Sequence, residues 1–68
     1  MRNSRSFQRS IDQGPFSIEL HTWRTAEKAM FATFIYEKAG ERLFRERFTG
    51  SGQNEVIRQA LMWCDENS

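Results

Sequence analysis

Residues 30–36 constrain the fold of this chain more than any other segment. They are apolar at nearly every position, and they read Met30-Phe31-Ala32-Thr33-Phe34-Ile35-Tyr36. Aromatic and β-branched residues favour strands, and a strand that is apolar on both sides needs both faces at least partly covered. We therefore expect a central strand of a sheet here.

A second strand is expected just before it. From residue 16, one side of the chain carries Phe16, Ile18, Leu20 and Thr22, and the other carries Ser17, Glu19, His21 and Trp23. This period of two is typical of a half-buried strand. Gly14-Pro15 marks a break ahead of it, because proline fixes its own φ and moves the preceding residue away from the helical region. Residues 1–14, polar and rich in Ser, Arg and Gln, are expected to form a flexible N-terminal arm.

The third strand is expected over residues 42–48, and its register depends on the preceding turn. If Lys38-Ala39-Gly40 is a three-residue loop with Gly40 in the left-handed position and a G1 bulge, Phe44 lies opposite Phe34. A two- or four-residue loop instead places Phe44 beside Ile35 and divides the aromatic residues between the faces. We favour the first register, because Gly40 fits it and the apolar residues become contiguous.

After residues 49–52 the apolar period becomes helical, with Ser51 as the expected N-cap. The expected buried stripe is Val56, Ile57, Ala60, Leu61 and Cys64, with Trp63 on its edge. The sequence therefore predicts an α+β fold, β-β-β followed by one C-terminal helix packed on one face of a three-stranded antiparallel sheet. Residues 15–68 would form this single small domain.

One face of such a sheet is left uncovered. The helix is expected to cover Phe16, Ile18, Leu20, Met30, Phe34, Phe44 and Phe48. The bare face would then show Trp23, Phe31, Ile35 and Leu43 among Glu19, His21, Thr33, Arg45 and Arg47. Apolar groups rimmed by charges are typical of an interface. The alternatives are that the arm folds back over this face through Phe7 and Ile11, or that the register differs.

The favoured partner is another protein, and a second copy in a homodimer is the first candidate. The partner-binding residues would be Trp23, Phe31, Ile35, Leu43, Arg45 and Arg47. A chain of 68 residues has a small core, and a second copy would add buried area.

The alternative partner is DNA or RNA bound on the sheet. The contacting cations would be Arg2, Arg5, Arg9, Arg24, Arg45 and Arg47, with aromatic rings stacking on bases. Ten Lys and Arg residues stand against nine Asp and Glu residues, a net charge of +1. Because binders of nucleic acid usually carry a clear basic excess, this balance opposes the alternative.

Catalysis is not expected. Cys64 and His21 are the only candidates for a nucleophile and an imidazole base. The acids Asp65 and Glu66 and the C-terminal end of a helix all raise the pKa of a thiol. A metal site needs more His or Cys, and no residue pattern implies a cofactor or small-molecule substrate. No apolar stretch has the length of a membrane span or signal peptide, and a lone cysteine suits a reducing compartment. We therefore expect a small cytoplasmic protein that regulates by binding.

Overall fold

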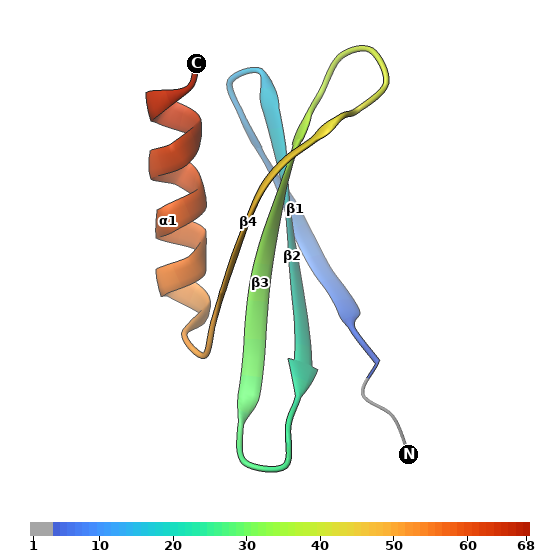
Figure 1. The fold of residues 1–68 in the computed structure, drawn as a ribbon, viewed down its shortest axis with the longest axis vertical. Coiled ribbons are helices and arrows are strands. Elements are labelled where there is room, and N and C mark those ends of the chain that lie inside the picture. The colour runs from blue at the N-terminus through green and yellow to red at the C-terminus, as the bar shows by residue number, and fades with distance from the viewer. Residues whose placement is uncertain (1–3) are drawn as a thin grey trace.

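The structure, a computed structural model, describes residues 4–68. Within this range the chain forms four strands and one helix: β1 (Ser6–Gln13), β2 (Phe16–Arg24), β3 (Ala29–Glu37), β4 (Phe44–Gly50) and α1 (Gln53–Glu66) (Figure 1). The strands are antiparallel and pair in the order β1-β2-β3-β4. The predicted α+β class, an antiparallel sheet with a C-terminal helix packed on it, is confirmed.

The sheet has four strands and not the predicted three, because residues 6–13 of the expected flexible arm form β1. This strand pairs with β2, and Gly14 and Pro15 form the turn between them. Gly14 has φ +60°, a left-handed conformation that glycine adopts without steric cost. The sequence of β1 has almost no apolar pattern, and only Ile11 and Gln13 of this strand are partly buried. Residues 1–3 of the expected arm, Arg2 among them, lie outside the described residues.

The faces of β3 are the reverse of the predicted ones. Ile35 lies opposite Ile18 and Thr33 lies opposite Leu20, so both side chains share the core face of β2 and are 0% exposed. Phe31 lies on the same face, two residues before Thr33. The prediction that Phe31, Thr33 and Ile35 belong to the bare face is therefore wrong. Since β3 is apolar on both sides, its own pattern did not distinguish them.

The register between β3 and β4 also differs from both of those considered. Phe44 lies opposite Tyr36, whereas the residue opposite Phe34 is Arg47. Gly40 has the expected left-handed φ of +68°. However, the connection runs over residues 38–43, and β4 begins two residues later than predicted.

A β-bulge at Arg45 explains how β4 divides its aromatic residues. Glu46 pairs with Ile35 and Phe44 pairs with Tyr36, so Arg45 is the extra residue in the ladder. One unpaired residue reverses which face the following side chains take. As a result, Phe44 and Phe48 lie on opposite faces of the sheet, although their spacing in a regular strand would place them together.

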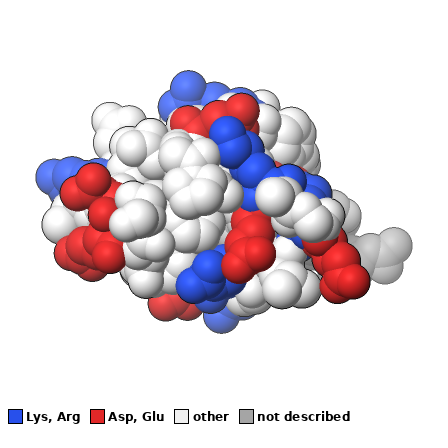
Figure 2. Space-filling model, turned by 90° about the horizontal axis from the view of Figure 1, so that it is seen from above, with Lys and Arg blue, Asp and Glu red and all other residues white. Residues whose placement is uncertain are grey.

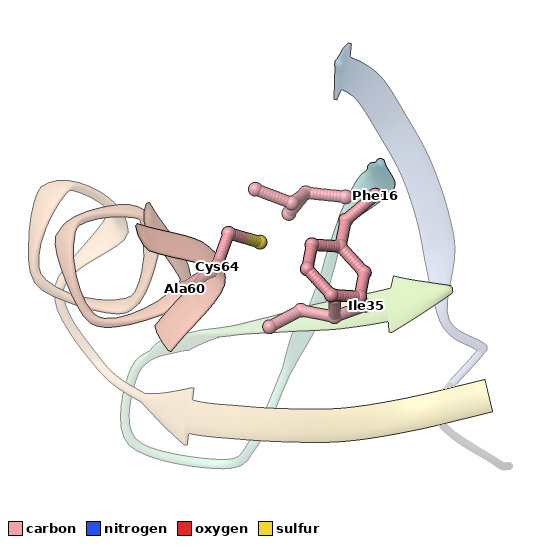
Figure 3. Packing of buried hydrophobic residues seen from close by; sticks show 5 residues of the cluster. Phe16, Ile35, Ala60 and Cys64 are labelled. Carbon is pink, nitrogen blue, oxygen red and sulfur yellow. The ribbon is translucent and has the colours of Figure 1, made fainter. Parts of the chain in front are cut away.

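The core lies between α1 and the sheet. Val56, Ala60 and Cys64 are the buried residues of α1, which confirms the predicted stripe. Ala60 and Cys64 pack with Phe16 and Ile35, and the Cys64 sulfur points toward the sheet (Figure 3). The helix contacts mainly β3 and β4. No helix within residues 4–68 has the length and apolar character of a membrane span.

The start of α1 differs from the prediction by one residue. Its N-cap is Gly52 and not Ser51, and no side chain bonds to the free N–H groups of the first turn. Deeper in the core, the Thr33 hydroxyl donates to the Val56 carbonyl at 3.1 Å. This bond satisfies a hydroxyl that is otherwise fully buried.

Candidate functional site: the open face of the sheet

The face of the sheet that points away from α1 is here called the open face, since no other element within residues 4–68 covers it. The strand register assigns it Phe7, Ser10, Asp12, Ser17, Glu19, His21, Trp23, Met30, Ala32, Phe34, Tyr36, Phe44, Arg47 and Thr49. Of the apolar residues predicted for the helix side, Met30, Phe34 and Phe44 therefore lie on the open face, whereas Phe16, Ile18, Leu20 and Phe48 face α1 as predicted.

Aromatic rings form a connected row across the open face. The ring centroids of Phe7 and His21 are 5.6 Å apart, and those of His21 and Phe34 are 5.1 Å apart. The row continues from Phe34 to Phe44 at 6.5 Å and from Phe44 to Tyr36 at 5.7 Å. These separations are those of favourable aromatic pairs. Phe7, at one end of the row, and Phe44, next to its other end, remain 55% and 53% exposed, so rings near both ends of the row face solvent.

Arginine side chains lie among these rings. The Arg5 guanidinium lies over the Phe34 ring at 4.6 Å, and that of Arg42 lies over the Tyr36 ring at 4.7 Å. Cations at such distances are attracted to the ring faces. Arg47 is exposed and stands opposite Phe34. The open face is therefore both aromatic and basic.

The acids of this face are engaged by its own cations. The carboxylate of Glu19 accepts hydrogen bonds from His21 Nε2 at 3.0 Å and from Arg42 Nη2 at 3.3 Å. The bond from His21, together with Arg42, holds the pKa of Glu19 below its usual range although partial burial acts to raise it. Asp12 lies 4.0 Å from the Lys38 ammonium. Within residues 4–68, Arg5 and Arg47 make no ion pair, so positive charge predominates.

A shallow hollow of about 460 Å³ opens in the open face. Its lining residues are Arg5, Trp23, Ala32, Phe34, Arg47 and Thr49. Ala32 and Thr49 lie directly opposite each other on β3 and β4, and these small side chains leave the space. Trp23 lies toward one end of them and Phe34 toward the other. The hollow thus has small residues at its middle and large rings at its two ends.

Of the predicted partner-binding residues, Trp23 and Arg47 lie on the open face and line the hollow. Phe31 and Ile35 face α1, as described above. Leu43 is 54% exposed but lies in the connection before β4.

Arg45 is on the helix side, which corrects its placement on the bare face. Its guanidinium lies 5.5 Å from the Phe16 ring and 5.3 Å from the Trp63 ring. It also donates to the Glu37 carboxylate at 2.9 Å. These contacts occupy Arg45 at the edge of the core.

The remaining arginines of the nucleic-acid alternative are separated by the structure. Arg5 lines the hollow. Arg9 lies opposite Leu20 on the helix side, and Arg24 ends β2 as an exposed residue. Sequence reasoning missed Arg42 because it lies in the connection before β4, where no residue pattern indicates that its side chain returns to Tyr36.

Cys64 and His21 are not brought together. Cys64 is 1% exposed in the core between α1 and the sheet, and burial raises the pKa of its thiol. His21 lies on the other side of the sheet with its Nε2 on Glu19. In the part of the chain that the structure describes, no three His, Cys, Asp or Glu side chains gather as a cation site. The open face is therefore the strongest candidate for function.

No family model matches the chain, and no curated protein or solved structure matches it either.

Seen from the end that holds the C-terminus and the β1–β2 and β3–β4 turns, the molecule shows acidic and basic side chains interspersed around uncharged surface (Figure 2). The described side chains at that end form no field of a single sign.

Proposed function

We propose that this protein is a non-catalytic module that binds single-stranded nucleic acid on the open face of its sheet. The supporting observation is that exposed aromatic rings share one surface with Arg5 and Arg47, which make no ion pair among the described residues. Proteins that bind single strands combine positive charge along the phosphates with aromatic side chains on which bases stack. The open face offers both.

The balanced total charge does not oppose this proposal once the charges are located. On α1, the acids Glu55, Asp65 and Glu66 outnumber the single base Arg58. These acids lie on the helix side, away from the open face. Salt screens the interaction of exposed charges over roughly 8 Å at physiological ionic strength. A nucleic acid bound on the open face would therefore interact mainly with the arginines of that face.

The test measures the binding of a labelled thymidine oligonucleotide of about 10 nucleotides, with fluorescence anisotropy as the readout. Arg47→Glu should weaken binding about tenfold or more, because it replaces a phosphate contact with repulsion. Arg58→Glu makes the same charge change on α1 and should weaken binding far less. Equal affinities for Arg47→Glu and the unmodified protein would overturn the proposal.

The second candidate function is association with a protein, including a second copy of this chain. It is supported by Phe7, Leu43 and Phe44, each more than half exposed, since large exposed apolar groups mark interfaces. In a symmetric dimer through the open face, however, the same surface of both copies is in contact. The arginines of one open face would then meet those of the other, and like charges across an interface are unfavourable.

Pairing of two sheets through β4 is also opposed. The backbone N–H of Arg47 donates to the Glu46 carboxylate at 3.1 Å, and charged side chains on an edge strand hinder the addition of another strand. Light scattering separates the candidates. The protein partner would be favoured if the protein forms a salt-insensitive dimer, if Phe44→Glu dissociates that dimer, and if the protein does not bind the oligonucleotide. For either candidate the proposed compartment is the cytoplasm, supported by the free thiol of Cys64.

A further inference from the structure

We propose that the hollow between Trp23 and Phe34 receives one unstacked base of the bound strand. The inference rests on the proposed function and adds a position and a selectivity to it. The protein would then prefer a single strand over a duplex of the same sequence, because a paired and stacked base cannot enter the hollow.

The space in the hollow suits a planar group. Its volume of about 460 Å³ falls within the roughly 300–1,000 Å³ of small-ligand pockets. That space exists because Ala32 and Thr49, which oppose each other, have short side chains. A larger side chain at Thr49, which is exposed, would fill it without entering the core on the other side of the sheet.

The rings at the two ends supply surfaces for stacking. Trp23 and Phe34 both line the hollow, and every base has a π face that can stack on such rings. The Arg5 guanidinium lies over the Phe34 ring at 4.6 Å, so the face of this ring has room for a planar group. A base that stacks on Phe34 would displace the guanidinium of Arg5.

Displacement of Arg5 is compatible with its place in the chain. Arg5 is exposed and precedes the first residue of β1, so its movement breaks no strand pairing. Once displaced, its guanidinium can donate to the phosphate beside the stacked base. Arg47, also in the lining, offers a second cation to the same backbone.

The selectivity follows from the geometry of nucleic acids. In a duplex the bases are stacked and paired, so a protein surface meets phosphates and groove edges. In a single strand an unstacked base can leave its neighbours and stack on an aromatic side chain. The rings of the hollow would therefore add affinity only for the single strand.

The experiment compares two oligonucleotides of equal charge on two variants that each gain a phenylalanine, one inside the hollow and one outside it. The probes are the thymidine oligonucleotide and an abasic oligonucleotide of the same length, which keeps the phosphates and lacks the bases. We expect the unmodified protein to bind the thymidine strand about tenfold more tightly, as expected for one stacked base. Thr49→Phe should remove this difference and retain the abasic affinity, whereas Asn54→Phe, which adds the same ring at an exposed position of α1 away from the hollow, should preserve it.

Tryptophan fluorescence provides an independent readout. Trp63 lies at the edge of the core on α1, so Trp63→Phe leaves Trp23 as the only indole. The thymidine strand should quench emission from this variant, and the abasic strand should not. Trp23→Phe, which keeps Trp63, should show no quenching with either strand. Circular dichroism of each variant checks that the fold is retained.

The outcomes separate this inference from the proposed function. Equal binding of the thymidine and abasic strands, with a loss in Arg47→Glu, overturns the base site but leaves strand binding intact. Absence of binding to either strand by the unmodified protein overturns both, and a protein partner on the open face would then be the alternative. Duplex affinity equal to that of the thymidine strand also contradicts the base site.

Discussion

Glu19 shows how a single residue links the open face to stability. A carboxylate only accepts hydrogen bonds, so Nε2 of His21 carries the proton that it donates to Glu19. Nδ1 of His21 is buried and has no partner within residues 4–68. The ring is therefore held by Glu19 on one side and by the aromatic contacts with Phe7 and Phe34.

The first prediction concerns Glu19→Gln. This change should lower the free energy of unfolding by about 0.5–1 kcal/mol at neutral pH, the range of a partly exposed ion pair. Because the folded-state pKa of Glu19 lies below the ordinary value of 4.5, its contribution is present above that value. It is lost as the pH falls through the folded-state pKa.

Urea unfolding at neutral pH and in strongly acidic solution measures the effect. The difference between the unmodified protein and Glu19→Gln should vanish in acid. Glu27→Gln, in the exposed connection between β2 and β3, serves as the control and should change stability little at either pH. A difference that persists unchanged in acid would contradict the assignment.

At the scale of elements, the face on which a side chain of β3 or β4 lies predicts whether a charge placed there unfolds the protein. Ile35 is 0% exposed, whereas Phe44 is 53% exposed. Ile35→Glu places a charge in the core and should unfold the protein, since the cost exceeds about 4 kcal/mol. Phe44→Glu should fold normally. Thermal unfolding, monitored by circular dichroism, distinguishes these results. If the faces were those predicted from the sequence, Ile35→Glu would fold and Phe44→Glu would unfold the protein.

The beginning of α1 offers a stabilising substitution. Gly52 has φ −110° and ψ 120°, an extended conformation that any residue adopts. A Cβ added there would meet the Cβ of Glu55 at 3.5 Å, an ordinary contact. Gly52→Ser should therefore raise stability by about 0.5–1 kcal/mol, through a side-chain cap and a less flexible unfolded chain. Gly52→Ala, which cannot cap, should gain less in the same thermal melts.

The sequence sufficed for elements with a clear apolar period. The alternation that starts at Phe16 predicted β2, and the spacing of Val56, Ala60 and Cys64 predicted the buried side of α1. β1 was missed because its side chains are almost all polar and exposed. It is held by backbone pairing with β2 and by the packing of Ile11 against the core, and one apolar contact leaves no period in the sequence.

The candidate site was predicted only in part, for a related reason. Trp23 was placed correctly because the strict alternation of β2 fixes its face. Phe34 and Phe44 were assigned to the core, since β3 is apolar on both sides and nothing in the sequence indicates the bulge at Arg45. Register is a property of two strands together, and a single sequence leaves it open where one strand of the pair, here β3, has no polar side.

For the whole molecule, the placement of charge predicts how binding depends on salt. With two or three phosphate contacts, from Arg5, Arg47 and Arg42, the affinity for a single strand should fall roughly tenfold between about 50 and 200 mM salt. Anisotropy titrations across that range give the slope of log affinity against log salt. Arg47→Glu should make the slope shallower by about one contact. A slope near zero would indicate that the rings alone hold the ligand.

The position of Arg5 determines how such measurements should be arranged. Arg5 lines the hollow, so a tag or tether attached close before Arg5 in the sequence would be near the ligand. Ser68 instead lies near the Gly14 turn, 3.9 Å from a Cβ built there, at the opposite end of the sheet from Trp23 (Figure 1). Immobilisation through the C-terminus leaves the hollow accessible, whereas attachment through the N-terminus would hinder the binding that the experiment sets out to detect.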